Sequence, residues 1–325
     1  MEMYNGFDIF GKNGTKISPA QLIYEKTDFV NSWLFMSSPV PVVSILVVYL
    51  LFVLKLGPSF MKDRQAYKLQ TLIPIYNAVQ VGISAFLLYL CAAMMSANGL
   101  VPKTCVMETE YNRRHITAVM HYYFLAKISE LLDTIFFVLR KKSNQVTFLH
   151  VYHHTLMVAV TWIALKYEPT YTVLFLGLLN STVHVVMYTY YGLSSVPSLT
   201  KYLWWKKYIT SMQLIQFALI LIHFGIAFMV SECSPSYTMT IAMAINGTLF
   251  LYLFGNFYVN TYNKKTNKDT QFKNGTNKTD IKNKTFENGM KYGKGKTNAD
   301  SQYTSASITV NDTYRIRFNL GKKAT

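Results

Sequence analysis

Repeated apolar runs, each about as long as a lipid bilayer is thick, constrain this chain more than any other feature. A helix that crosses the hydrocarbon core needs about 20 mostly apolar residues. Such runs recur along the chain between shorter polar segments; they cover residues 39–56, 71–95, 116–139, 150–165, 171–191, 208–230 and 237–259. The pattern predicts an all-α, polytopic membrane protein with seven transmembrane helices.

The composition and the placement of charge agree with this prediction. Only 15% of the residues are charged, against about 25% in soluble domains. More than half of the net charge of +16 lies in residues 261–325, which contain 14 Lys and Arg against 5 Asp and Glu. The other basic residues fall mainly in short loops beside the apolar runs, as the positive-inside rule expects. This distribution argues against a base-reading surface, so no nucleic-acid partner is expected.

Three regions and an orientation follow from the same pattern. Residues 1–37 form a polar N-terminal segment and residues 38–260 the seven-helix transmembrane domain. Residues 261–325 form a tail that is rich in Lys, Asn and Thr and is expected to be disordered. Because the basic loops and the tail share one side of the membrane, that side is expected to be cytoplasmic and the N-terminus lumenal.

Short motifs outside the spans add further expectations. Cys105 and Cys233 both fall on the lumenal side, where an oxidising compartment favours a disulfide; the alternative is two unpaired thiols. Asn13 begins an Asn-Gly-Thr glycosylation sequon, which is usable only in the lumen. Lys322 and Lys323 stand fourth and third from the C-terminus, as in the dilysine retrieval signal of endoplasmic-reticulum membrane proteins.

Ionisable residues inside the spans are candidates for a functional site, because burying them in a membrane is costly. In the third run, Lys127, Glu130 and Thr134 share one face at helical spacing, with Asp133 at its margin. A buried structural ion pair between Lys127 and Glu130 is the alternative interpretation. The fifth and sixth runs add polar candidates, which are Asn180, His184, Tyr188, Tyr191, Gln213 and Gln216.

The densest cluster is formed by His150, His153 and His154, three of the seven histidines within five residues. On a helix they converge on one side, and imidazole suits proton transfer, metal binding or nucleophilic attack near neutral pH. A membrane di-iron oxygenase needs more clustered histidines than this chain provides, so no metal is expected. Metal-free acid–base or nucleophilic catalysis is favoured instead. A seven-helix receptor or lipid transporter would not explain these clusters.

Four segments, in their order and spacing, resemble the elongases of very long chain fatty acids. They are residues 127–134, 150–154, 180–191 and 210–216. The resemblance as a whole covers about residues 30–260. The resemblance implies an enzyme of the endoplasmic-reticulum membrane that condenses an acyl-CoA with malonyl-CoA, releases CO2 and CoA, and yields a 3-oxoacyl-CoA two carbons longer. It also implies a ring of helices around a narrow substrate tunnel, open to the cytosol and closed toward the lumen.

The same resemblance assigns roles to the clusters. His153 is the expected nucleophile, which takes the acyl group as an acyl-imidazole. His150 and His154 orient and deprotonate it, and His184 assists decarboxylation of the malonyl group or stabilises the enolate. A variant in which the histidines act only as bases stays open. The expected substrate-binding residues are Lys127, Glu130, Asp133, Thr134, Asn180, Tyr188, Tyr191, Gln213 and Gln216.

Basic residues at the cytoplasmic ends of the spans are candidate partners of the CoA phosphates, or serve topology alone. They are Arg140, Lys141, Lys142, Lys206 and Lys207. No cofactor is expected beyond the substrates malonyl-CoA and acyl-CoA. The resemblance further implies a homodimer and, as partners, the 3-ketoacyl-CoA reductase, the dehydratase and the enoyl-CoA reductase of the elongation cycle.

Overall fold

The computed structural model describes residues 9–10, 16–17 and 28–263, and the side chains of residues 28–262. Three expectations therefore lie outside the described residues: glycosylation at Asn13, retrieval through Lys322 and Lys323, and disorder of nearly the whole tail. Near the N-terminus, two short strands pair antiparallel; they are β1 (Ile9–Phe10) and β2 (Lys16–Ile17).

Long α-helices form most of the chain between residues 28 and 263. They are α2 (Val40–Leu51), α4 (Leu72–Asn98), α5 (Glu110–Leu139), α6 (Phe148–Tyr167), α7 (Val173–Ser194), α8 (Lys206–Val230) and α9 (Tyr237–Tyr258). The shorter helices are η1 (Asp28–Ser32), η2 (Phe52–Leu56), α3 (Gly57–Met61), η3 (Val106–Glu108), η4 (Pro197–Tyr202) and η5 (Val259–Asn263).

Six helical segments in the described part of the chain are long and apolar enough to cross a membrane. They are Val40–Met61, Leu72–Asn98, Phe148–Tyr167, Val173–Ser194, Lys206–Val230 and Tyr237–Tyr262. The seventh long helix, α5, is more polar because it carries Lys127, Glu130 and Asp133, yet it packs against α4, α6 and α7. The prediction of an all-α, multi-pass membrane protein is confirmed.

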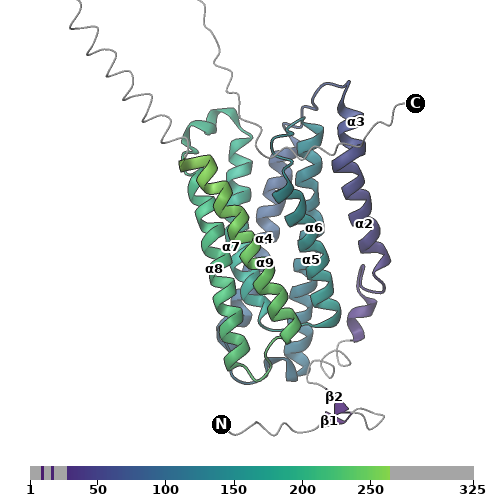
Figure 1. Cartoon of the computed structure of the whole chain (residues 1–325), viewed down its shortest axis with the longest axis vertical. Helices are drawn as coiled ribbons and strands as arrows, with labels where there is room; N and C mark the ends of the chain where they lie inside the picture. The colour runs from purple at the N-terminus through teal and green to yellow at the C-terminus, as the bar shows by residue number, and fades with distance from the viewer. Residues whose placement is uncertain (1–8, 11–15, 18–27, 264–325) are drawn as a thin grey trace, which may run out of the picture. The chain divides into compact units, whose positions relative to one another are not determined.

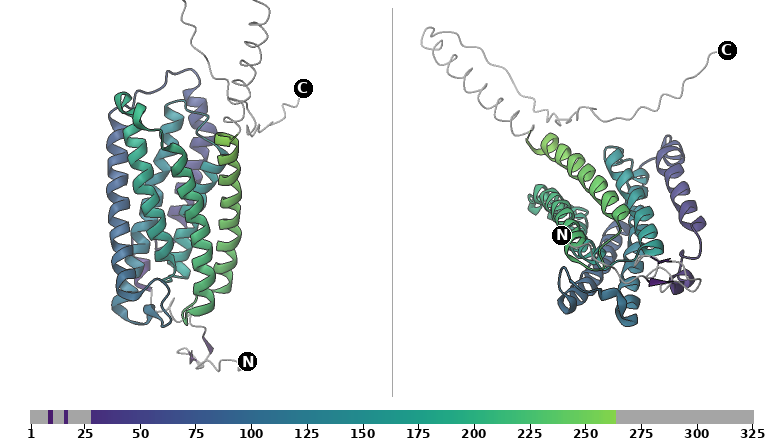
Figure 2. Two further views of the ribbon diagram at one scale, coloured as in Figure 1. Left: turned by 90° about the vertical axis from the view of Figure 1, so that its left-hand side faces the viewer. Right: turned by 60° about the horizontal axis from the view of Figure 1, so that its bottom comes forward.

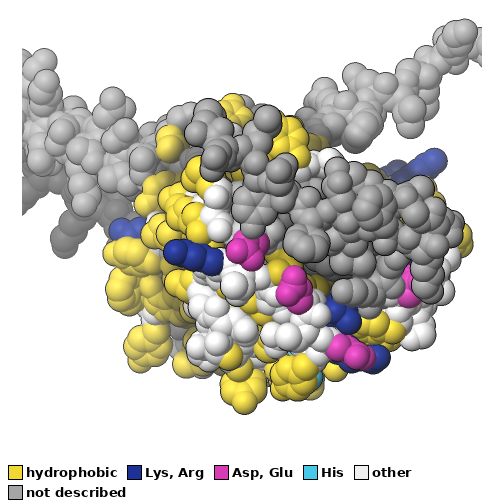
Figure 3. Space-filling view, turned by 90° about the horizontal axis from the view of Figure 1, so that it is seen from below, with side chains coloured by type: hydrophobic (Ala, Val, Ile, Leu, Met, Phe, Trp, Pro, Cys, Tyr) yellow, Lys and Arg dark blue, Asp and Glu magenta, His cyan; other side chains and the backbone are white. Residues whose placement is uncertain are grey.

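The long helices run alongside one another and alternate in direction, because short connections join consecutive helices (Figures 1 and 2). The pairs in contact include α4 with α7, α5 with α6, α7 with α8, and α8 with α9. We call the end where α6 and α8 begin the histidine end, and the end where they finish the disulfide end. Viewed from the disulfide end, acidic and basic side chains lie among apolar ones, as expected of a surface that meets water (Figure 3).

Helix α4 shows how a membrane helix divides its residues between lipid and protein. Its outward face is apolar, and Ile75 and Phe86 keep 57% and 50% of their surfaces exposed. Its inward face carries Asn77, Gln80 and Ser84, all buried. Polar side chains turn inward because hydrocarbon offers them no hydrogen-bond partner. The polar side chains of α4 therefore face the interior of the bundle.

Two helix ends differ from the sequence prediction. The sequence indicates a polar segment at residues 96–115, between the runs 71–95 and 116–139, but α5 begins at Glu110, because the Thr109 hydroxyl caps it by accepting a hydrogen bond from the Asn112 main-chain N–H at 3.4 Å. The first span continues past Leu56 into α3. A Cβ on Gly57 would come within 2.7 Å of Val138 on α5, so glycine permits the close approach of α3 and α5.

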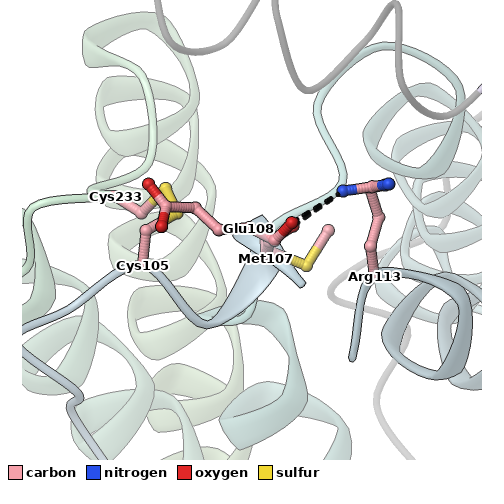
Figure 4. Close-up of a disulfide and its surroundings, with 5 residues drawn as sticks. All are labelled: Cys105, Met107, Glu108, Arg113 and Cys233. Carbon is pink, nitrogen blue, oxygen red and sulfur yellow. Dashed lines mark hydrogen bonds between the residues drawn. A yellow bond between two sulfur atoms is a disulfide. The ribbon is translucent and has the colours of Figure 1, made fainter. Parts of the chain in front are cut away.

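A disulfide joins Cys105 to Cys233, with their Cα atoms 4.9 Å apart (Figure 4). It ties the connection between α4 and α5 to the connection between α8 and α9. Beside it, the Arg113 guanidinium donates hydrogen bonds to the main-chain oxygens of Met107 and Glu108 at 3.2 and 3.1 Å. These contacts fix the irregular backbone that closes the disulfide end.

Replacing both Cys105 and Cys233 with serine is expected to lower the thermal stability of the protein. The bridge closes a loop of 128 residues, and loop-closure entropy puts the loss at no more than about 5 kcal/mol. The measurement is the apparent melting temperature in detergent. Wild-type protein treated with reductant should melt like the double variant, and reductant should not affect the variant further. Equal melting temperatures for oxidised wild type and variant would contradict the prediction.

Candidate active site

A buried ion pair on α5 forms the centre of the site. The Lys127 ammonium donates hydrogen bonds to both carboxylate oxygens of Glu130, at 2.7 and 3.0 Å. Both side chains are buried, with 2% and 3% of their surfaces exposed. Residues three apart on a helix are neighbours on one face, so local sequence alone brings them together. The pairing offsets much of the cost of burying two charges.

Helix α7 supplies the other partners of this pair. The side-chain oxygen of Asn180 accepts hydrogen bonds from Lys127 at 2.7 Å and from the Tyr123 hydroxyl at 2.8 Å. One turn further along α7, Nδ1 of His184 lies 3.1 Å from a Glu130 oxygen. A carboxylate can only accept, so His184 carries a hydrogen on Nδ1 and directs Nε2 away from the pair. The contact therefore fixes the orientation of the ring.

A second carboxylate lies one turn toward the histidine end. Asp133 accepts a hydrogen bond from the Tyr188 hydroxyl at 2.8 Å, and Tyr188 is completely buried. The rings of Tyr188 and His184 are 5.6 Å apart. Asp133 therefore holds α7 against α5 through Tyr188, next to the Lys127–Glu130 ion pair.

The first two turns of α6 carry the three clustered histidines. The Thr147 hydroxyl caps this helix by accepting a hydrogen bond from the main-chain N–H of His150 at 3.2 Å. Nε2 of His150 then lies 3.0 Å from the Thr134 hydroxyl, which is also bonded to the Tyr49 hydroxyl at 2.8 Å. Three helices, α2, α5 and α6, thus meet at Thr134 and hold the His150 ring.

His153 and His154 lie deeper along α6. The His154 ring is buried, 4.4 Å from the ring of His150 and 5.5 Å from that of His153. His153 packs edge-on against Phe250 of α9 at 5.0 Å, and its buried Nδ1 has no hydrogen-bond partner among the described residues. His153 lines the same cavity as Tyr123 and Asn180, and the side-chain oxygen of Asn180 accepts a hydrogen bond from Lys127. The histidines of α6 and the ion pair of α5 are therefore one site.

An apolar cavity of about 310 Å³ leads away from His153. It follows α6 to Tyr167 and Glu168 and is walled by α5, α7, α8 and α9. The Gln216 side-chain oxygen, buried without a partner in the described chain, lies in its wall. Most of the remaining lining is apolar, for example Val119, Met157, Val160, Leu176, Ile220, Phe224, Ala242 and Met243.

Other residues expected in the site lie at its edge. Gln213 contacts the Met187 sulfur at 3.9 Å, and Tyr191 is 36% exposed beside the Tyr188 ring. Five basic residues lie at the histidine end, all exposed except the half-buried first; they are Arg140, Lys141, Lys142, Lys206 and Lys207. Among the described residues, no three or more His, Cys, Asp or Glu side chains are arranged to hold a metal ion.

Three side chains of the site were not singled out in the sequence. Tyr123 lies one turn before Lys127 on the same face of α5, so helical spacing offered a signal. Tyr49 and Phe250 come from α2 and α9, and both resemble ordinary aromatic residues of an apolar run. Their contacts with Thr134 and His153 span 85 and 97 residues, and no local pattern indicates them.

Comparisons with known proteins agree on one grouping. The profile of the ELO (GNS1/SUR4) family matches residues 34–270. Very long chain fatty acid elongase 7 of Rattus norvegicus is 39% identical over 250 residues, which cover 76% of this chain and 89% of that protein. Very long chain fatty acid elongase 4 of Homo sapiens is 39% identical over 282 residues, covering 83% and 88%. Very long chain fatty acid elongase 2 of Mus musculus is 38% identical over 252 residues, covering 76% and 85%.

Proposed function

The chain belongs to the ELO (GNS1/SUR4) family, and on that premise we propose that it is the condensing enzyme of fatty acid elongation. The enzyme joins a long-chain acyl-CoA to malonyl-CoA, releases CO2 and CoA, and forms a 3-oxoacyl-CoA two carbons longer. The family resemblance of the sequence motifs is confirmed by these matches. The acyl chain and the chemistry are proposals that the geometry supports.

The position of His153 carries this proposal. Its imidazole stands at the head of an apolar cavity, with one buried ring nitrogen unpartnered among the described residues. A nucleophile needs an available lone pair beside its substrate, and an alkyl chain needs an apolar enclosure. The mostly apolar lining of the cavity disfavours water, which would otherwise hydrolyse a reactive acyl intermediate.

The first half-reaction transfers the acyl group to the enzyme. A ring nitrogen of His153 attacks the thioester carbonyl of acyl-CoA; a carbon–nitrogen bond forms and the carbon–sulfur bond breaks. The proton on the other ring nitrogen leaves the imidazole and goes to the departing thiolate, so CoA is released as the thiol. The His154 ring lies 5.5 Å from this ring and the His150 ring 4.4 Å from that of His154, and the two relay that proton.

The second half-reaction forms the new carbon–carbon bond. Malonyl-CoA loses its carboxylate as CO2, and the electron pair of the broken bond becomes a thioester enolate. His184, held by Glu130, assists this loss or stabilises the enolate. The enolate carbon attacks the acyl carbon, the carbon–nitrogen bond breaks, and the His153 imidazole takes back a proton. Each turnover therefore consumes one proton.

We also propose an orientation and a location. The histidine end faces the cytosol, where the exposed basic residues contact the CoA phosphates. The disulfide end faces the oxidising lumen of the endoplasmic reticulum, which puts the N-terminus in the lumen. A homodimer and association with the two reductases and the dehydratase of the elongation cycle are part of the same proposal.

The test is a condensation assay on purified protein. Malonyl-CoA is supplied with saturated acyl-CoAs from about sixteen carbons upward. This range of acyl lengths matches the length of the cavity, which follows α6 from His153 to Glu168 at about 1.5 Å per helical residue. Mass spectrometry should find 3-oxoacyl-CoA without any added metal or nicotinamide. No product from any chain length with folded protein would refute the proposal.

Acyl-CoA alone separates the two versions of the chemistry. If His153 is acylated, intact-protein mass rises by the acyl group, and peptide mapping places it on residues 150–154. If the histidines act only as bases, no adduct accumulates although condensation proceeds once malonyl-CoA is added.

A further inference from the structure

The apolar cavity ends where a second cavity begins. The second cavity, of about 330 Å³, lies at the disulfide end, and its lining includes Thr170, His223, Ser231 and Glu232. Glu168 is the one residue among those described that lines both cavities. This position therefore lies between the apolar cavity and a more polar one.

Glu168 is held in place by the start of α9. It follows the last turn of α6, where its main-chain N–H donates to the Ala164 oxygen at 2.9 Å. Its carboxylate accepts hydrogen bonds from the Ser236 main-chain N–H and, at 2.7 Å, from the Ser236 hydroxyl. That hydroxyl in turn accepts from the Met239 N–H at 3.1 Å. A carboxylate at a helix N-terminus is favoured by the helix dipole, so this contact is stable.

An alkyl chain cannot pass such a barrier without breaking it. The terminal methyl group of the chain would have to displace hydrogen bonds to a carboxylate and gain none in return. Residues 153 to 168 advance about 22 Å along α6 at about 1.5 Å per residue. An extended polypeptide main chain reaches about 3.5 Å per three bonds, so an extended alkyl chain advances about 1.2 Å per bond. At that advance the barrier lies about 18 carbon–carbon bonds from the His153 imidazole.

We propose that the contact between Glu168 and Ser236 is the end wall of the acyl tunnel and determines the longest acyl chain that the enzyme accepts. The inference rests on the proposed function and names a specificity-determining pair for it. Removing the carboxylate joins the two cavities, so the tunnel gains length at the disulfide end while the histidines and the ion pair are unchanged.

The experiment compares product lengths for the wild type and Glu168→Ala. Both proteins receive malonyl-CoA and saturated acyl-CoAs of increasing length. Wild-type rates should fall sharply beyond the limiting length, whereas the variant should accept substrates at least one two-carbon unit longer, with rates on the shortest substrate within about threefold of wild type, because its reacting groups are intact. Glu232→Ala is the matched control, since this exposed carboxylate lines only the second cavity.

Two further variants test whether misfolding, rather than loss of the end wall, explains a changed length limit. Glu168→Gln keeps the shape and an oxygen that accepts from Ser236, so it should retain the wild-type limit. Ser236→Ala loses one of the two bonds and should shift the limit in the same direction as Glu168→Ala, by a smaller amount. Thermal unfolding of each variant shows that the protein is folded. A folded Glu168→Ala protein that turns over short substrates with the wild-type length limit would overturn the inference.

A second measurement needs no turnover and so separates the two proposals. Non-hydrolysable thioether analogues of acyl-CoA are added, and the rise in melting temperature is recorded against chain length. In the wild type the rise should stop increasing at the limiting length, and in Glu168→Ala it should continue to longer chains. Identical curves would refute the end wall even if no condensation were detected, whereas a lack of condensation with shifted curves would refute only the proposed reaction.

Discussion

Replacing His153 with alanine is expected to lower the rate of condensation by about 10³-fold or more, the usual scale for loss of a catalytic nucleophile. The methyl group of alanine cannot attack a thioester, and no other described histidine stands at the head of the cavity. The measurement is the initial rate of 3-oxoacyl-CoA formation, together with the mass of the protein after exposure to acyl-CoA. The variant should show no acyl adduct.

The control for this prediction is His115→Ala. His115 is exposed near the disulfide end of α5, and its one side-chain hydrogen bond within the described residues is to the Tyr111 main-chain oxygen one turn back, so its loss should leave the rate unchanged. A His153→Ala protein that retained more than a tenth of the wild-type rate would show that His153 is not the nucleophile. His154, whose ring lies 5.5 Å away, would then be the next candidate.

Replacing Glu130 with alanine is expected to impair both folding and catalysis. The Lys127 ammonium would lose its two bonds to the carboxylate and stay buried, which costs about 3–5 kcal/mol of stability. His184 would lose the acceptor that orients its ring. We expect condensation to fall by about 100-fold, as for loss of a residue that orients a catalytic group. The measurements are the apparent melting temperature and the rate at saturating substrate.

A double variant distinguishes the two losses. Lys127→Met with Glu130→Leu removes both charges and fills a similar volume with apolar atoms, so stability should return close to that of the wild type. Activity should not return, because the Glu130 carboxylate that orients the His184 ring is absent. If the double variant were as active as wild type, the ion pair would be structural only. If Glu130→Ala were as stable as wild type, leaving the Lys127 ammonium buried without its carboxylate partner would not destabilise the protein, and the stability prediction would be wrong.

The fold was largely predictable because its main determinant is local. Each apolar run is a contiguous segment, and its length and hydropathy do not depend on the rest of the chain. The start of α5 was missed for a local reason as well. Residues 110–115 are polar and resemble a loop, but the cap at Thr109 allows them to continue the helix.

The candidate site was predictable only along single helices. The spacing of Lys127 and Glu130 is sufficient to expect them to be neighbours. Their contacts with Asn180 and His184, more than 50 residues away, depend on how α5 and α7 are rotated about their axes, which sequence spacing does not determine. Glu168 illustrates the limit most clearly. Its sequence neighbourhood, Glu168-Pro169, indicates a turn, whereas its partner Ser236 lies 68 residues later.

In the proposed mechanism, α6 carries the nucleophile His153 near one end and the end wall Glu168 just past the other, and this restricts how the product length can change. Inserting one residue between them would add about 1.5 Å of reach but rotate one end by about 100° against the other, so either the imidazole or the carboxylate would face the wrong side. Lengthening the helix is therefore a poor route to longer lipids. Substitution at Glu168 would be the simpler route, because it would change the longest accepted acyl chain and leave the position of His153 unchanged.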